Sequence, residues 1–177
     1  MTGISAPQIS IVGHSRLGKT ALLAGALDHR FLCAFSNDSG CSGAALSREN
    51  TGETIRRITD RFPYWFCEEY KKYADNESAL PFDQHYLLAA NIPHMVYVAS
   101  ASLDDWACQK NEFLSCVAAS EYYKAETGNG FVAPDRDVEV GDAFHVGNIG
   151  YHLRYGDHCL SRADWNYYIE FLNYHIK

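Results

Sequence analysis

The chain has 177 residues, of which 47% are hydrophobic and 21% charged; this composition suits one folded domain and excludes a disordered chain. Its formal net charge of -7 argues against nucleic acid as the main partner, because phosphates need a basic face. No apolar run approaches the ~20 residues of a membrane span, and the first residues lack the basic start of a signal peptide.

The first half of the chain alternates apolar runs with polar turns. Residues 8–13 are β-rich and end at a glycine, which predicts a buried strand. Residues 18–31 carry Ala and Leu at helical spacing, and residues 31–36 form a second apolar run. A polar, glycine-rich loop is expected over residues 37–53.

The middle of the chain predicts two helices and a third strand. Residues 53–74 are amphipathic with an interruption at Pro63, and residues 77–93 suggest a helix that ends before Pro93. The apolar run 94–101 is the third strand, with a loop after it.

The last third predicts a helix over residues 112–127, a loop over 128–142 and a strand within 147–158 that runs into a turn. A closing helix is expected over 163–175, capped by Asp164 or Ser161.

Alternation of strands and helices points to a three-layer α/β sandwich, with residues 1–177 as a single domain. The six cysteines form no C-x-x-C pair, so a zinc knuckle is not expected; their even number permits disulfides without implying any. Neither a metal nor a cofactor is predicted.

The stretch GHSRLGKT, residues 13–20, matches two motifs with different chemistry. As G-x-x-x-x-G-K-[ST] it is a phosphate-binding loop in which Lys19 grips a phosphate. As G-x-S-x-x-G it nearly matches the strand-to-helix turn that exposes the nucleophilic serine of α/β-hydrolases, here Ser15. The usual turn has its second glycine at the position of Leu17, whereas this chain has Gly18 one residue later.

The remaining acids and histidines favour the hydrolase interpretation. Nucleotide hydrolysis needs a magnesium-orienting Asp at the end of a second apolar strand, and no run reads cleanly in that way. Hydrolases instead require the chain order serine, acid, histidine, with acid and histidine just after strands. Ser15, then Asp38 or Asp104, then His158 satisfy that order.

Five segments together resemble the bacterial glucuronoyl esterases of carbohydrate esterase family 15, in order: residues 13–31, 36–55, 61–89, 96–113 and 150–165. The family carries the pattern G-[CH]-S-R-x-G-K, which accounts for the displaced glycine. The resemblance implies a serine esterase of the α/β-hydrolase fold that hydrolyses esters of (4-O-methyl-)glucuronic acid, as in lignin–carbohydrate linkages to glucuronoxylan.

Carried over by position, the resemblance assigns Ser15 as nucleophile, His158 as base and Arg16 as an oxyanion stabiliser. It also assigns Lys19 and Trp106 to the sugar ring, which Lys19 would contact through its cation and Trp106 through its indole.

Glu53 and Arg61 complete the sugar site, although Arg61 falls where some relatives have glutamine. For the acid we expect Asp104 rather than Asp38, because Asp38 stands where many relatives have the longer Glu. Asp104 also shares a loop with Trp106 and so borders the cleft.

An α/β-hydrolase places its nucleophile after the fifth strand, so the sequence is expected to be the C-terminal half of a longer enzyme, truncated at its N-terminus. The implied partner is a small or polymeric glucuronate ester, acted on by a secreted or periplasmic enzyme that is a monomer when full length. The alternatives are a fragment with little or no activity, a binding module, or a phosphate-loop nucleotide hydrolase.

Overall fold

The computed structural model describes residues 9–176 and is built around one five-stranded sheet. The strands are β1 (Ser10–His14), β2 (Cys33–Asn37), β3 (Met95–Ala101), β4 (Ala143–Phe144) and β5 (Ile149–Arg154). Their spatial order is β1-β2-β3-β5-β4, with β1, β2, β3 and β5 parallel and β4 antiparallel to β5. The carboxyl ends of the parallel strands therefore share one edge of the sheet, where α/β proteins bind their ligands.

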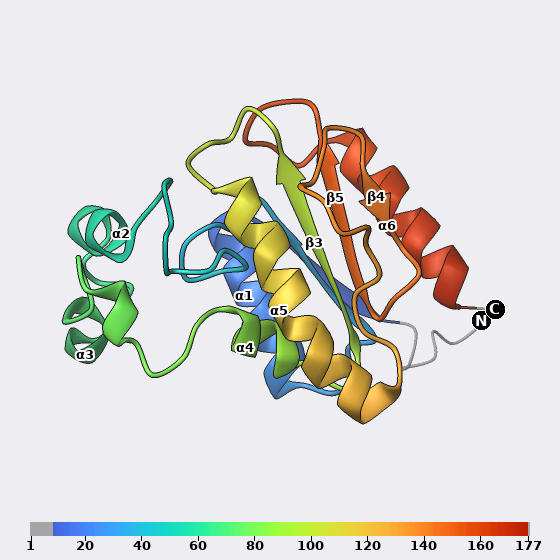
Figure 1. Ribbon diagram of the computed structural model, residues 1–177, viewed down its shortest axis with the longest axis horizontal. Helices are drawn as coiled ribbons and strands as arrows, with labels where there is room; N and C mark the ends of the chain where they lie inside the picture. Colours follow the sequence, from blue (N-terminus) through green and yellow to red (C-terminus); the bar gives the residue numbers. More distant parts are fainter. Residues whose placement is uncertain (1–8, 177) are drawn as a thin grey trace, which may run out of the picture.

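Helices cover both faces of the sheet, which confirms the predicted three-layer α/β class (Figure 1). They are α1 (Arg16–Leu27), α2 (Ile55–Arg61), α3 (Glu68–Lys71), the 3-10 turn η2 (Glu77–Ala79), α4 (His85–Ala89), α5 (Gln109–Thr127) and α6 (Arg162–His175). Helices α1, α4 and α5 pack on one face and α6 on the other.

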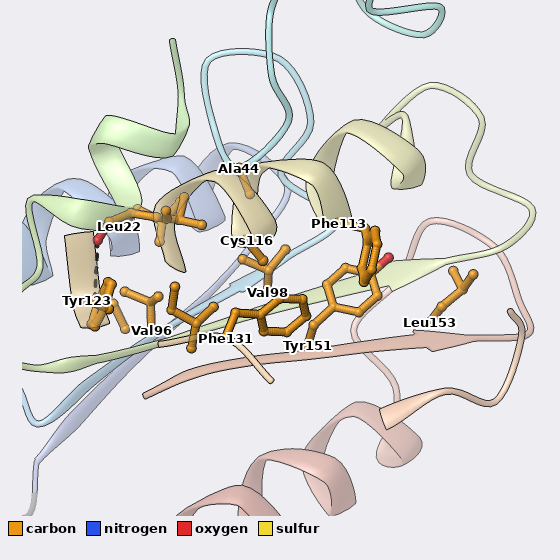
Figure 2. Close-up of a cluster of buried hydrophobic side chains, with 14 residues drawn as sticks. Leu22, Ala44, Val96, Val98, Phe113, Cys116, Tyr123, Phe131, Tyr151 and Leu153 are labelled. Carbon is orange, nitrogen blue, oxygen red and sulfur yellow. Dashed lines mark hydrogen bonds between the residues drawn. The ribbon is translucent and has the colours of Figure 1, made fainter. Parts of the chain in front are cut away.

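Side chains alternate between the two faces of the sheet along each strand, and this produces two core layers. In β3, Val96 and Val98 face α5, and Figure 2 shows Val98 beneath Cys116 and Val96 beside Tyr123. Tyr97 faces α6 and packs on Phe171. Successive side chains of a strand point to opposite faces, so an unbroken apolar run is what a strand buried on both faces requires.

A third apolar cluster lies beside the sheet instead of on it. Ile55 and Ile58 of α2 are fully buried with Cys41 and Leu80, in the excursion that carries α2 and α3 away from the sheet (Figure 1). This excursion supplies one wall of the site described below.

The helices predicted in the middle of the chain are shorter than the sequence pattern indicates. The amphipathic stretch 53–74 forms α2 and α3, broken around Pro63 as expected, and residues 77–93 form only η2 and α4. The two-residue strand β4 was not predicted, because a strand that short has no periodicity. Gln8, at the start of the first predicted strand, lies outside the described residues.

The remaining elements match the predicted ones within a few residues. Ser161 is the N-cap of α6, and Asp164 completes a capping box with it, so both predicted capping residues take part. All six cysteines lie in the described part of the chain and are free. Over residues 9–176, no helix combines the length and apolarity that crossing a membrane requires.

Candidate active site

Ser15 occupies a strained turn between β1 and α1. Its φ is 56° and its ψ -123°, a conformation that L-residues rarely adopt, and its backbone N–H donates to the carbonyl of Asn37 at 2.8 Å. Such strain marks functional sites, and here it places the serine where a strand becomes a helix.

The glycines of GHSRLGKT have a steric explanation. A Cβ on Gly13 would lie 1.9 Å from the carbonyl oxygen of Leu17, so only glycine fits there. On Gly18 a Cβ would lie 2.9 Å from Ser39 Cβ and 3.2 Å from the Gly13 carbonyl oxygen, whereas Leu17 is 60% exposed. The close approach of helix and strand therefore falls at Gly18, which accounts for the displaced glycine.

The predicted acids and histidine follow strands at the same edge of the sheet as Ser15. Asp38 directly follows β2, Asp104 lies three residues beyond β3, and His158 lies four beyond β5. One carboxylate oxygen of Asp38, one of Asp104 and one ring nitrogen of His158 lie within 4.8 Å of one another.

His158 is hydrogen-bonded to Asp104, with Nδ1 2.5 Å from Oδ2. Asp104 is 6% exposed, and this hydrogen bond raises the pKa of His158 above its ordinary value. Because an ionised carboxylate only accepts hydrogen bonds, Nδ1 carries the proton, and neutral His158 presents a lone pair on Nε2.

Asp38 makes different contacts. Its Oδ1 accepts the Ala101 N–H at 2.8 Å, and its Oδ2 lies 3.6 Å from Arg154 Nη2. Burial, reinforced by the carboxyls of Glu112 and Asp104, raises the pKa of Asp38 to about 9. A pKa of about 9 favours the protonated form of Asp38 beside the Asp104–His158 pair at neutral pH.

Glu112 of α5 is a buried acid that the sequence analysis did not single out. Its carboxylate accepts the backbone N–H groups of Ser39 and Gly40 at 2.9 Å each and the Ser100 hydroxyl at 2.6 Å. Burial raises its pKa to about 7. Glu112 anchors the loop after β2, which forms the floor of the site.

Lys19 lies one helical turn beyond Ser15 and is already held by protein groups. Its ammonium donates to the carbonyls of Ser39 and Cys41 and lies 3.7 Å from Glu53 Oε2. Burial lowers the pKa of Lys19, which Glu53 opposes. Two backbone carbonyls and the Glu53 carboxylate already occupy the ammonium that would grip a phosphate, so the phosphate-loop interpretation is not favoured.

All nine predicted site residues line one cavity of about 350 Å³. These are Ser15, Arg16, Lys19, Asp38, Glu53, Arg61, Asp104, Trp106 and His158. Asp105, the neighbour of Asp104, lines a different cavity.

Sequence reasoning missed an aromatic wall of this cavity. Phe62 and Trp65 are stacked with ring centroids 4.0 Å apart, and the guanidinium of Arg16 lies 5.0 Å from the Trp65 ring. The aromatic run of residues 62–66 was the available signal, but only the path of the excursion brings it to the site.

Comparisons with known proteins agree with this geometry. The family model described as "Glucuronyl esterase, fungi" matches residues 1–127. Carbohydrate esterase MZ0003, from an unknown prokaryotic organism, is 44% identical over 99% of this chain and 40% of its own length. The 4-O-methyl-glucuronoyl methylesterase of Schizophyllum commune is 34% identical over 66% of this chain and 32% of its own.

Among solved structures, the glucuronoyl esterase from Solibacter usitatus superposes with a TM-score of 0.89 at 40% identity, covering 98% of this chain and 44% of that one. The chain thus spans less than half the length of these relatives, and it has the α/β-hydrolase fold that they share. The chain belongs to the glucuronoyl esterases of carbohydrate esterase family 15.

Proposed function

We propose that the protein is a serine esterase that hydrolyses esters of glucuronic acid, including 4-O-methyl-glucuronic acid. The observation that carries the proposal is the convergence of Ser15, on its strained turn, with the hydrogen-bonded His158–Asp104 pair in one cavity. The names of its relatives, a glucuronoyl esterase and a 4-O-methyl-glucuronoyl methylesterase among them, support this substrate class.

In the proposed reaction the Ser15 hydroxyl attacks the ester carbonyl and passes its proton to His158 Nε2. Asp104 keeps the imidazole in the required tautomer and stabilises its cation. The tetrahedral intermediate collapses, the alcohol leaves with the proton from His158, and an acyl-enzyme remains. Water then attacks the acyl carbon with His158 again as base, which releases the glucuronic acid.

Arg16 and the backbone N–H groups at the start of α1 lie beside Ser15 and are proposed to stabilise the oxyanion. The guanidinium of Arg16 lies over the Trp65 ring, which holds it at the cavity wall. The proposed sugar site is made of Lys19, Glu53 and Trp106, joined by a hydrogen bond from the Glu53 N–H to the Trp106 carbonyl at 2.8 Å.

Arg61 lines the same cavity and is proposed as a further sugar contact. A polymeric glucuronate ester lies outside the cell, so we also propose that the enzyme is secreted or periplasmic.

The decisive experiment compares hydrolysis of benzyl glucuronate by the chain and by its Ser15→Ala variant. We expect the substitution to lower kcat by up to about six orders of magnitude, as when a complete triad loses its nucleophile. A parent chain without activity would contradict the esterase proposal for this chain, and an equally active Ser15→Ala variant would identify another nucleophile.

A further inference from the structure

Asp164, in the first turn of α6, is a buried carboxylate with more partners than a helix cap needs. It is 0% exposed, and its Oδ2 accepts the N–H and hydroxyl of Ser161 at 2.6 Å each. Its Oδ1 also accepts His152 Nε2 at 3.0 Å. Burial opposes its charge, but these hydrogen bonds and one from Arg154 lower the pKa of Asp164, so it is ionised.

The first connection from Asp164 leads to the backbone on both sides of His158. Arg154 Nε donates to Asp164 Oδ1 at 2.8 Å, while Arg154 Nη2 donates to the carbonyls of Asp157 at 3.2 Å and Cys159 at 2.5 Å. These two residues flank His158 directly. One guanidinium, held by a buried carboxylate, thus fixes the turn that presents the base.

The second connection leads to the ring of His158. Asn37 Nδ2 donates to Asp164 Oδ1 at 3.2 Å, which turns Asn37 Oδ1 towards His14 Nδ1 at 2.7 Å. His14 therefore carries its proton on Nδ1, and its ring packs on that of His158 with centroids 4.5 Å apart. Burial, together with the nearby His158, lowers the pKa of His14, so a neutral ring lies against the base.

We propose that Arg154 and Asp164 are positioning residues for His158: they hold the backbone on both sides of the base and, through Asn37 and His14, one face of its ring. A base displaced by about 1 Å loses roughly 100-fold in rate, so a device that fixes both backbone and ring has a direct catalytic consequence. The inference rests on the proposed esterase function only for its activity readout.

A purely structural role, joining β5 to the start of α6, is the competing explanation. The chain offers a matched control, because Arg48 makes the same kind of contacts away from the site. Arg48 Nη1 lies 3.2 Å from the buried carboxylate of Asp83, and its guanidinium donates to the carbonyls of Phe82 and Leu80. Arg154→Lys and Arg48→Lys therefore remove the same kinds of contact at different places, although the Arg48 side chain is 39% exposed and that of Arg154 is 7% exposed.

The experiment measures three quantities for the chain and both lysine variants: the thermal midpoint, the pKa of His158 by NMR titration of its ring nitrogens, and kcat and KM on methyl glucuronate. Five charged or titratable groups lie near His158 besides its turn: Asp104 after β3, Asp38 after β2, His14 at the end of β1, Lys19 of α1 and Glu112 of α5. Of these, Asp104 provides the hydrogen bond that raises the pKa.

For Arg154→Lys we expect the pKa of His158 to fall towards its ordinary value and kcat to fall by about 10- to 100-fold, with KM changed by less than about threefold. Arg48→Lys is expected to lower the thermal midpoint at most. A folded Arg154→Lys variant whose His158 titration and kcat equal those of the parent overturns the proposal.

Asp164→Asn provides a second route should Arg154→Lys fail to fold, because it keeps one oxygen for Arg154 Nε and removes the charge. The same direction of change is expected, with the same overturning result. The titration requires no substrate, so a parent chain that lacks esterase activity contradicts the proposed function and still leaves the positioning of His158 measurable.

Discussion

His158 and Asp104 lie 54 residues apart in the sequence and are joined by a 2.5 Å contact between Nδ1 and Oδ2. In Asp38, the other candidate acid, Oδ1 instead accepts a hydrogen bond from a backbone N–H at the end of β3. The two carboxyls are neighbours, yet they differ in the partner that each one meets. This difference leads to the first prediction.

Asp104→Ala is expected to lower kcat at least about tenfold more than Asp38→Ala, with little change in KM, because only Asp104 orients the imidazole. The measurement is steady-state hydrolysis of benzyl glucuronate by both single variants and the double variant. Equal losses in the single variants, with no further loss in the double variant, would mean that the acids act as one unit. Loss of all activity in Asp38→Ala alone would reverse the assignment.

The second prediction concerns pH. His158 acts as a base only when neutral, so kcat/KM rises with pH through its pKa, and the Asp104 hydrogen bond places that limb above pH 6.5. In Asp104→Asn the limb should move to lower pH while the plateau falls. A limb below pH 6.5 in the parent, or one unmoved in the variant, would count against His158 as the base.

Ionisation of Glu112 has to be distinguished from the limb assigned to His158, because the pKa of Glu112, about 7, lies in the same pH range. Its carboxylate contacts Ser39, Gly40 and Ser100 and makes no hydrogen bond to His158. Asp104 also raises the pKa of Glu112, so a limb that belongs to Glu112 would move in the same direction when Asp104 is replaced. Glu112→Gln, which removes only a Glu112 limb, separates the two.

The sequence pattern was sufficient for the fold class and for the edge of the sheet that carries the candidate site, for one physical reason. Parallel strands all end at the same edge of a sheet, so residues that follow apolar runs, such as Ser15, Asp104 and His158, are brought together without knowledge of the loops. The order of strands and helices alone carries that information.

What the sequence did not reveal depends on long-range packing. Trp65 follows α2 and lines the cavity only through the path of the excursion, which no local pattern encodes. Asp164 is fully explained locally as the third residue of a capping box, which conceals its contacts with Arg154 and Asn37. Because the capping box already accounts for an acid at this position, the sequence gives no sign that Asp164 has further partners.

The third prediction tests the sugar site. Trp106→Ala should lower kcat/KM for glucuronate esters by at least about tenfold while leaving acetyl aryl esters nearly unaffected, because an indole that contacts only the sugar does not help a substrate that lacks one. Trp165→Ala is the matched control, since Trp165 is 45% exposed, against 41% for Trp106, and lies on α6 outside the cavity. Equal losses on both ester classes would refute a sugar-binding role.

The last prediction follows from the ionisation of Asp38. Its folded pKa is raised from 3.8 to about 9 by burial, so the folded protein holds a proton there that the unfolded chain has released above pH 4. The sign is therefore that Asp38 contributes most at low pH and that stability falls as pH rises from about 4 towards 9. The slope from one such group is at most about 1.4 kcal/mol per pH unit.

Asp38→Asn cannot ionise and should remove this slope, so its unfolding free energy, relative to that of the parent, should rise steadily between pH 5 and 9. Asp164 provides a control of opposite sign: its pKa is lowered, so its contribution is present above about pH 4 and lost as pH falls. Asp164→Asn should accordingly show no slope of its own over the same range, apart from a change near the pKa of His158, which this substitution is expected to lower. The measurement is denaturant unfolding of the three proteins at unit steps of pH. A constant difference in unfolding free energy between Asp38→Asn and the parent would show that Asp38 is ionised in the folded protein and paired with Arg154.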